Sequence, residues 1–482
     1  MKIFNSATRE IEEFVPLYKE SPPSLKLRKG TVGMYTCGPT VYDYPHIGHG
    51  RKYVYDDLLK RLLIYSGFTV THVQNITDVG HLVSDADEGE DKLEAGAAKF
   101  GKSVWETAEM FIKGFYETTD KLNILRPDVV CRATDHIPEQ IELIKKLVDK
   151  GFAYDTAEAV YFDVAKFPRY GELSGQRLTD KLVAARQEVQ TGSHKKNPVD
   201  FALWFKLFGR FEKHVMKWDS PWGAGFPGWH IECSAMSMKY LGETFDIHTG
   251  GEDHIPVHHT NEIAQSEAAT GKPFVKYWMH SAFLMVDGQK MSKSLGNMYR
   301  VEEVVEKGFD AMALRYLYLT AHYRTPLNFT WSSLAAAQSA YDKLCQFVRI
   351  ARSPQLATRK NLSKEKLKKI DQYRERFLEV VNNDLNFPQG LAVVWEMVKS
   401  NIPDMDKTEL LLDWDQILGL GLLNAQEGAV IPEEVTRLAN EREGLRKSGK
   451  FVEADGVRMQ IEKLGFIVKD SSTGPVINVK RN

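Results

Sequence analysis

The stretch from Thr31 to Val73, TVGMYTCGPTVYDYPHIGHGRKYVYDDLLKRLLIYSGFTVTHV, decides the fold class. Its first part, Thr31 to Gly38, ends in a Cys-Gly-Pro turn and is typical of a buried strand. Arg51 to Tyr65 has apolar residues at helical spacing and predicts an amphipathic helix. Phe68 to Val73 is rich in β-branched residues and predicts a second strand. A strand, a helix and a strand of these lengths form a parallel βαβ unit, so we predict an α/β protein with a doubly wound sheet.

The 482 residues exceed what one hydrophobic core usually serves, so several domains are expected. Outside the first unit we predict a helix at His136 to Lys150, strands at Ala159 to Phe162, Phe245 to His248 and Ser281 to Val286, helices at Leu334 to Ile350 and Lys364 to Val381, and a short strand at Phe466 to Val468. The predicted segments are residues 1–125, the first half of the sheet domain; 126–219, an α+β insertion; 220–309, the second half of the sheet domain; 310–430, an α-helical bundle; and 431–482, a small C-terminal tail.

The composition is that of a soluble globular protein, with 43% hydrophobic and 27% charged residues. A formal net charge of −2 means that any contact with nucleic acid depends on local clusters of Lys and Arg. No apolar stretch approaches the roughly 20 residues of a membrane span, and the first residues lack the pattern of a secretion signal. The spacing of Cys37, Cys131, Cys233 and Cys345 is not that of a disulfide scaffold. We therefore expect a cytoplasmic protein without membrane contact.

Two histidines, His46 and His49, flank Ile-Gly at the predicted turn from strand to helix. Imidazoles and backbone amides at the positive end of a helix can stabilise the charge of a triphosphate, and Gly48 would let a nucleotide approach closely. The alternative is a pair of histidines that caps the helix or lies on the surface. This motif alone therefore does not decide between the two interpretations.

A second motif, Lys290-Met291-Ser292-Lys293-Ser294, follows an apolar run and an Asp-Gly turn. It places two lysines on a loop that can close over a phosphate chain, although a solvated basic loop would have the same composition. Together, the two motifs resemble the signature of the class I aminoacyl-tRNA synthetases. The resemblance implies a Rossmann-like catalytic domain in which His46, His49, Lys290 and Lys293 are catalytic and bind ATP, with Gly48 and Asp253 also in the ATP site. It also implies Mg²⁺ with ATP.

Four further stretches carry a closer resemblance. They are Tyr35 to Asp43, Gly228 to Met236, Gly250 to Asp253 and His258 to Glu262. These stretches resemble the cysteinyl-tRNA synthetases, which implies one Zn²⁺ ion bound by Cys37, Cys233, His258 and Glu262. Two thiolates, an imidazole and a carboxylate suit tetrahedral zinc. His258 and Glu262 are four residues apart, so they would share one face of a helix. By composition alone, His254 and His259 are rival ligands.

The resemblance assigns Cys37, Gly38, Thr77 and Trp229 to the amino-acid pocket. The alternative for Trp229 is that it is a residue of the hydrophobic core. It implies ATP, L-cysteine and tRNA(Cys) as substrates. We expect the protein to be a monomer. Selection of cysteine would follow from thiolate–zinc coordination, because zinc prefers a soft sulfur ligand to a hydroxyl or a methyl group. A separate editing domain is then unnecessary.

By the same resemblance, the insertion would approach the acceptor end of the tRNA, and the bundle with its tail would reach the anticodon. The chain departs from the family at Val79 to Leu82, where many relatives continue with acidic and lysine residues, and at Gly474 to Ile477, where relatives carry a tryptophan. Two alternative functions are that of a ligase that joins cysteine to an amino sugar and that of a catalytically silent RNA-binding paralogue. The long helical bundle disfavours the first, and the intact motifs disfavour the second.

Overall fold

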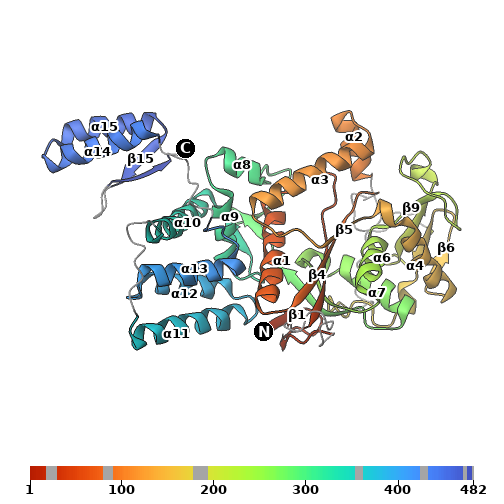
Figure 1. Cartoon of the computed structure of the whole chain (residues 1–482). Coiled ribbons are helices and arrows are strands. Elements are labelled where there is room, and N and C mark those ends of the chain that lie inside the picture. The colour runs from red at the N-terminus through yellow and green to blue at the C-terminus, as the bar shows by residue number, and fades with distance from the viewer. Residues whose placement is uncertain are drawn as a thin grey trace.

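A parallel five-stranded sheet forms the centre of the molecule (Figure 1). The computed structural model describes residues 1–17, 30–79, 91–176, 194–352, 362–423, 432–469 and 475–479. The strands lie in the order β11-β10-β3-β4-β5 and are β3 (Thr31–Thr36), β4 (Thr69–Ile76), β5 (Val129–Arg132), β10 (Phe245–Gly251) and β11 (Val275–Ser281). All neighbouring strands of this sheet are parallel, so the predicted βαβ unit and the doubly wound α/β fold are confirmed.

Helix α1 (Ile47–Tyr65) joins β3 to β4 and begins four residues before the predicted start. The side chain of His46 caps it by accepting hydrogen bonds from two backbone N–H groups of the first turn. The prediction of one buried face was wrong, because α1 lies between the sheet and the C-terminal helices and is buried on several sides. Even Arg51 is buried, and its guanidinium donates to four backbone carbonyls, those of Ala282, Phe283, His322 and Thr325.

The insertion forms a second, antiparallel sheet on one side of the central sheet (Figure 1). Its strands are β6 (Ala153–Asp155), β7 (Ala159–Phe162), β8 (Phe201–Lys206) and β9 (Gly225–Pro227), and α4 (Ile137–Asp149) packs beside them. The predicted helix and the predicted strand of this region are both confirmed. Strand β9 extends the sheet past residue 219, so the structural unit runs beyond the predicted boundary.

The predicted strand from Ser281 to Val286 was wrong. Strand β11 ends at Ser281, and β12 (Leu284–Val286) starts another sheet with β13 (Gln289–Lys290) and β14 (Leu327–Phe329). Both strands are largely buried, so the apolar run continues through the break and hides it in the sequence.

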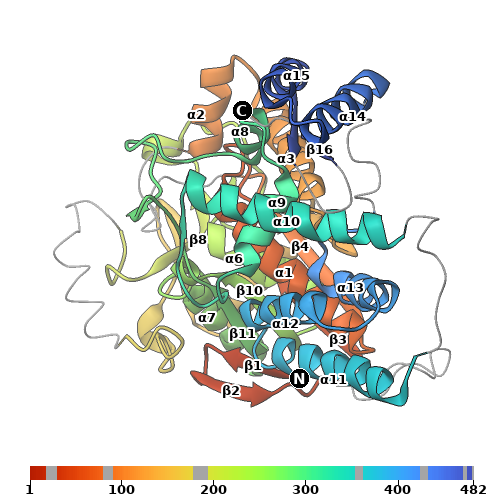
Figure 2. The same ribbon diagram turned by 90° about the vertical axis from the view of Figure 1, so that its left-hand side faces the viewer.

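The last third of the chain is helical, as predicted (Figures 1 and 2). Its helices are α8 (Val301–Glu306), α9 (Ala311–Leu319), α10 (Trp331–Ala351), α11 (Lys364–Val381), α12 (Phe387–Lys399), α13 (Asp404–Leu418), α14 (Glu433–Lys447) and α15 (Phe451–Lys463). A hairpin of β15 (Phe466–Lys469) and β16 (Val476–Val479) follows and confirms the predicted strand in the tail. The departures from the family at Gly80 to Leu82 and at Gly474 lie outside the described residues. The remaining elements are β1 (Lys2–Asn5), β2 (Glu10–Glu13), α2 (Lys92–Phe100), α3 (Val104–Lys121), α6 (Trp229–Leu241) and α7 (His258–Thr270).

A buried ion cluster attaches the bundle to α1. The guanidinium of Arg315 on α9 lies 2.5 Å from the Asp57 carboxylate, and Arg61 donates to the same carboxylate at 2.7 Å. Arg315 also donates to the carbonyl of Leu418, at the end of α13. Breaking a buried, hydrogen-bonded ion pair is costly, so this cluster fixes the position of the bundle against the helix that carries the two histidines.

Within the described residues, no helix is both long and apolar enough to cross a membrane.

A buried histidine joins the insertion to α2. The imidazole Nε2 of His214 lies 3.0 Å from the carboxylate of Asp91, the N-cap of α2, and 3.8 Å from Glu94. Burial lowers the pKa of His214, but the two carboxylates outweigh it and raise the pKa above the ordinary histidine value. The stabilisation is therefore fully present below the unfolded-state pKa of about 6.5 and is lost as the pH rises through the raised pKa of the folded protein.

Replacing His214 with glutamine is expected to lower thermal stability at low pH more than at high pH. The charged hydrogen bond contributes about 1–2 kcal/mol while the imidazole is protonated. Thermal midpoints of both proteins, measured between about pH 5.5 and about pH 9, should differ most below the ordinary histidine pKa of about 6.5 and converge as the pH rises through the raised pKa of the folded protein. A difference that does not change with pH would contradict this prediction.

Candidate active site

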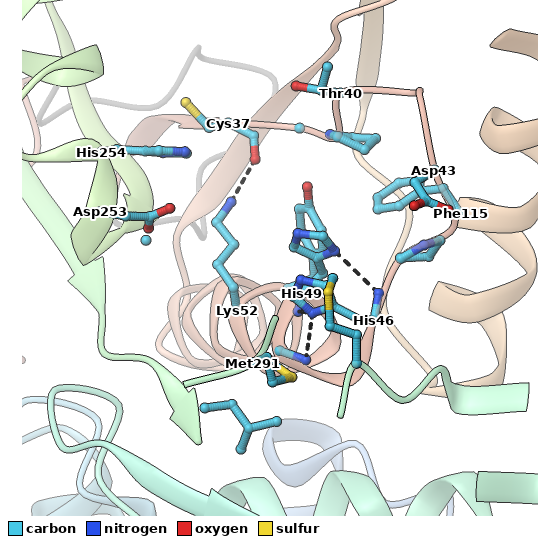
Figure 3. A pocket seen from close by; sticks show the side chains of 18 of the residues that line it. Cys37, Thr40, Asp43, His46, His49, Lys52, Phe115, Asp253, His254 and Met291 are labelled. Atoms are coloured by element: carbon cyan, nitrogen blue, oxygen red, sulfur yellow. Dashed lines mark hydrogen bonds between the residues drawn. The ribbon is translucent and has the colours of Figure 1, made fainter. Parts of the chain in front are cut away.

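A cavity of about 410 Å³ opens at the carboxyl ends of the parallel strands (Figure 3). Ligands of open α/β sheets bind at this edge, and the volume lies within the roughly 300–1,000 Å³ of small-molecule sites. Ten of the predicted site residues line the cavity: Cys37, Gly38, His46, Gly48, His49, Trp229, Asp253, His258, Lys290 and Lys293. Of the others, Cys233 and Glu262 are buried beside the lining residues Cys37 and His258. Thr77 is buried too, and its backbone is hydrogen-bonded to the lining residues Pro39 and Val41.

The two histidines of the first motif lie stacked at the start of α1, with ring centroids 3.6 Å apart (Figure 3). The Nδ1 of His46 accepts the backbone N–H groups of Gly48 and His49, and the Nδ1 of His49 accepts the N–H of His46. Burial lowers the pKa of His46 to about 4 and that of His49 well below its usual value. Both rings are therefore neutral, with their proton on Nε2 and their Nδ1 already used.

The alternative that these histidines cap the helix is therefore confirmed for His46, which accepts the first-turn N–H groups. Capping does not exclude a contact with a nucleotide. The sequence predicts that the first-turn amides meet a phosphate, but in this structure the N–H groups of Gly48 and His49 donate to His46. The side chains take their place, because each neutral ring keeps one N–H donor on Nε2. Gly48 accommodates the loop above it: a Cβ there would lie 2.3 Å from the Cε of Met291. The glycine therefore lets the two motifs approach each other.

Both lysines of the second motif also line the cavity. The ammonium of Lys293 lies 2.5 Å from the Asp43 carboxylate, and both side chains are exposed. Lys290 holds its ammonium 5.0 Å from the ring centroid of Phe283. Exposed contacts of this kind contribute little to stability, so both ammonium groups can leave their present partners and bind an anion that carries more negative charge.

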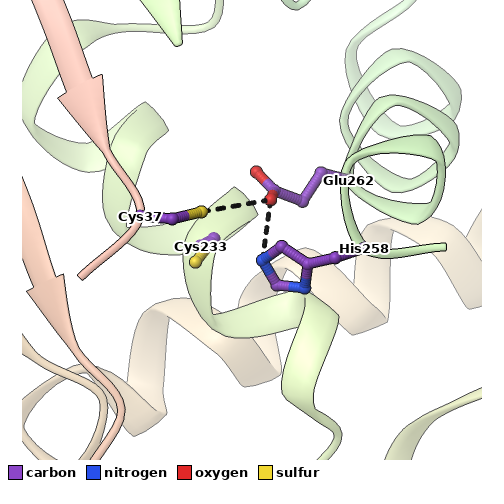
Figure 4. Close-up of side chains that lie close together, drawn as sticks. All are labelled: Cys37, Cys233, His258 and Glu262. Atoms are coloured by element: carbon purple, nitrogen blue, oxygen red, sulfur yellow. Dashed lines mark hydrogen bonds and ion pairs between the residues drawn. The ribbon is translucent and has the colours of Figure 1, made fainter. Parts of the chain in front are cut away.

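Cys37, Cys233, His258 and Glu262 converge from three elements (Figure 4). Cys37 follows β3, Cys233 lies on α6, and the other two lie one turn apart on α7. One donor atom from each lies within 4.8 Å of all the others, and all four residues are buried. The His258 Nε2 lies 2.9 Å from a Glu262 carboxylate oxygen, which lies 4.0 Å from the Cys37 sulfur. Two sulfurs, one imidazole and one carboxylate match the chemistry of a tetrahedral zinc site.

A second possible set shares Cys37 and Glu262 but uses His248 and His259, so one of the two rival ligands named from the sequence lies close by. The His259 Nε2 is 3.4 Å from the Cys37 sulfur, and its Nδ1 is 2.7 Å from the Nε2 of His280. Neither histidine of this set lines the cavity, whereas His258 does. Only the set with Cys233 therefore has two sulfur donors and two residues that reach the cavity. His254, the other rival, lines the cavity but belongs to neither set within the described residues.

Donor groups of the set with Cys233 have shifted pKa values. Burial raises the pKa of the Cys37 thiol, but the hydrogen bond from Cys233 and the imidazole of His259 outweigh burial and hold the pKa well below its usual range. Burial and the neighbouring Cys37 raise the pKa of Cys233 well above its usual range. The carboxylate of Glu262 overcomes burial and raises the pKa of His258 to about 10. Such compact clusters of mutually shifted groups are typical of functional sites.

The remaining predicted pocket residues differ in position. Trp229 is half-buried and stacks on the His258 ring, with centroids 4.2 Å apart, so it lies in the cavity wall and not in the core. Thr77 is buried, and its hydroxyl donates to the Glu232 carboxyl at 2.7 Å. The N–H of Gly38 donates to Asn75, and a Cβ on Gly38 would overlap the Asn75 carbonyl, so only glycine fits there.

Several lining residues were missed from the sequence: Tyr42, Asp43, Lys52, Lys92, Phe111 and Phe115. Two of them had a signal that could have found them. Asp43 lies three residues before His46, and Lys52 lies three residues after His49, one helical turn along α1. Lys92, Phe111 and Phe115 come from α2 and α3, which cross the cavity far from the motifs in sequence.

Comparison with known proteins identifies the family. Residues 23–339 match the protein family described as "tRNA synthetases class I (C) catalytic domain". A cysteine–tRNA ligase of Treponema denticola is 41% identical over an alignment of 497 residues, which covers 98% of this chain and 98% of the relative. Cysteine–tRNA ligase 1 of Burkholderia lata is 45% identical over 477 residues, which cover 98% of this chain and 96% of the relative. The chain belongs to the cysteine–tRNA ligase family.

Distant members of the larger class share the fold. The methionyl-tRNA synthetase of Mycobacterium tuberculosis, solved in complex with methionyl-adenylate, aligns with a TM-score of 0.57 at 14% identity, covering 82% of this chain and 91% of that chain. The family resemblance inferred from the sequence is therefore confirmed, and so is the class I fold with its Rossmann-like core and helical C-terminal region. Because the relatives of this family align over nearly their full length, the helical third belongs to the family as well.

Proposed function

We propose that this chain activates L-cysteine with ATP to cysteinyl-adenylate and pyrophosphate, and then transfers cysteine to the 3′-terminal adenosine of tRNA(Cys). One observation carries the proposal. A single cavity is lined both by the paired histidines and lysines of the nucleotide motifs and by Cys37 and His258 of the metal-type cluster. A cavity with these two ends suits a substrate that carries a thiol at one end and reacts with a triphosphate at the other.

In this proposal Cys37, Cys233, His258 and Glu262 would hold a zinc ion. When bound, the metal would supply a Lewis-acid position that favours a thiolate over a hydroxyl or a methyl group. The donor chemistry and the two residues that open on the cavity favour this set over the one with His248 and His259. We expect Mg²⁺ to accompany ATP.

The activation step needs positioning and charge stabilisation, and it needs no protein nucleophile. A carboxylate oxygen of cysteine forms a bond to the α-phosphorus while the bond from that phosphorus to pyrophosphate breaks. The Nε2–H groups of His46 and His49 would donate to the phosphate oxygens as neutral donors. Lys293 would leave Asp43 for the triphosphate, and Lys290 would approach the triphosphate from the end of β13.

The other parts of the chain have proposed roles as well. The insertion of residues 126–219 would contact the acceptor end of the tRNA, and the bundle of residues 310–430 with the tail of residues 431–482 would contact its stem and anticodon. We further propose a monomeric, cytoplasmic enzyme. The four cysteines are buried as free thiols, which accords with a reducing compartment.

Cysteine-dependent exchange of pyrophosphate into ATP tests the proposed activation directly. The rate with L-cysteine should exceed the rate with L-serine by more than about 100-fold in kcat/KM, because serine lacks the soft donor. Purified tRNA(Cys) should then be charged. Exchange without charging, together with ligation of cysteine to an amino sugar, would move the assignment to the small-molecule ligase, and the absence of exchange would contradict the proposal.

A further inference from the structure

A lysine lies between the two ends of the cavity. Lys52 lies on α1, three residues after His49, and its side chain is only 12% exposed. Its ammonium donates to the backbone carbonyl of Cys37 at 2.7 Å (Figure 3). It also lies 2.9 Å from the Asp56 carboxylate. The ammonium is thus bonded to the residue that supplies a sulfur to the metal-type cluster, while its own helix carries the histidines of the nucleotide end.

The contacts of Lys52 leave it capacity for a further anion. An ammonium group has three N–H donors, and within the described part of the chain it has two oxygen partners, the Cys37 carbonyl and Asp56. The ring of Tyr53 lies 4.5 Å from the ammonium and covers another side. Lys52 is also among the residues that line the cavity. A ligand in the cavity can therefore accept the remaining donor.

The other lysines of the cavity lie elsewhere. Lys290 ends β13, with its ammonium beside the ring of Phe283, and Lys293 lies in the loop that follows, beside Asp43. Lys92 lies beside the ring of Tyr42. Lys52 is the lining lysine whose described contacts include Cys37, a residue of the metal-type cluster. Its positive charge also contributes to the lowered pKa of His49, after burial and His46, which places it within electrostatic reach of the nucleotide end.

A substrate that joins these two ends must place its carboxylate between them. In the proposed reaction the thiol of cysteine lies at the cluster, and a carboxylate oxygen must reach an α-phosphate held near His46 and His49. Only two carbon atoms separate the sulfur of cysteine from its carboxylate carbon, so the carboxylate lies close to the residue that supplies the sulfur ligand. Lys52 is the cation at this position.

We propose that Lys52 binds the α-carboxylate of the substrate cysteine and holds it for attack on the α-phosphorus. The inference rests on the proposed function. One carboxylate oxygen forms the new bond to phosphorus as pyrophosphate leaves, and the other stays hydrogen-bonded to the ammonium; Lys52 keeps all its protons throughout. Lys52 would therefore distinguish a thiol that carries a carboxylate from one that does not.

Binding of three thiols to the metal-loaded enzyme tests this inference by calorimetry. The ligands are L-cysteine, cysteamine, which lacks the carboxylate, and 3-mercaptopropionate, which lacks the amine. For Lys52→Met, the Kd values of L-cysteine and 3-mercaptopropionate should rise by about 10- to 100-fold, the size of a lost charge-assisted hydrogen bond. The Kd of cysteamine should stay within about twofold of the wild-type value, because cysteamine makes no such bond.

Two outcomes would overturn the inference. Equal weakening of all three thiols would show that Lys52 acts on the cluster through the Cys37 carbonyl, and unchanged binding of all three would show that it does neither. If wild-type enzyme fails to bind L-cysteine at all, the proposed function fails instead. Lys113→Met, an exposed lysine on α3, is the matched control and should bind all three thiols like the wild type.

A second variant keeps the test usable if Lys52→Met is unstable. Removing Lys52 leaves Asp56 buried without its partner, so the double variant Lys52→Met/Asp56→Leu removes both charges together. It should show the same selective loss of carboxylate binding. Lys52→Arg keeps the positive charge and should recover a large part of the preference for L-cysteine over cysteamine.

Discussion

Replacing Cys233 with serine is expected to lower the affinity for zinc by more than about 100-fold and to abolish measurable cysteine activation. Loss of a residue that merely orients a metal ligand costs 10- to 100-fold in affinity, and Cys233 would be a ligand itself. The variant protein should therefore lose zinc on dialysis against a chelator. Metal content by atomic emission, the zinc Kd by competition with a chromophoric chelator, and pyrophosphate exchange together measure the effect.

This variant also decides between the two overlapping donor sets, because Cys233 belongs only to the set with His258. If the metal is held by His248 and His259 with Cys37 and Glu262, the serine variant should keep its zinc. Full zinc retention with full activity would contradict zinc-based selection through Cys233. Cys345→Ser is the matched control, since Cys345 is a buried cysteine of α10 in the helical bundle and should leave zinc binding unchanged.

The parts of the fold that depend on local spacing could be predicted from the sequence. The βαβ unit, helix α11 and strand β7 lie where apolar periodicity placed them. Periodicity failed where the surroundings of an element differ from those of an ordinary surface. It could not show that α1 is enclosed by the sheet and the bundle, or that a continuous apolar run divides into β11 and β12.

The candidate site divides in the same way. His258 and Glu262, four residues apart, lie one turn apart on α7 as their spacing predicts. No spacing rule relates Cys37 to Cys233, and only the family resemblance joined them before the structure brought their sulfurs together. Lys52 was missed because a charged residue on a helix is expected to face solvent, whereas this one is enclosed and paired with Asp56.

Replacing Lys293 with alanine is expected to lower the kcat of pyrophosphate exchange by about 100- to 1,000-fold, the cost of losing one preorganised donor to the charge that develops in the transition state. The Kd for L-cysteine should change little, because Lys293 lies on the loop that faces the start of α1 and has no described contact with the metal-type cluster. Exchange kinetics at saturating ATP and calorimetry with L-cysteine separate the two effects.

The ion pair between Lys293 and Asp43 makes the prediction sharper. Both side chains are exposed and lie 2.5 Å apart, so the pair is worth at most about 1 kcal/mol and ATP can displace Asp43 at little cost. Asp43→Asn should therefore change the KM for ATP by at most about fivefold, while Lys293→Ala lowers kcat. Lys113→Ala, an exposed lysine of α3, should change neither. If the two Asp43 and Lys293 variants lost activity equally, the function of Lys293 would lie in the ion pair that shapes the loop, and its proposed contact with the triphosphate would be wrong.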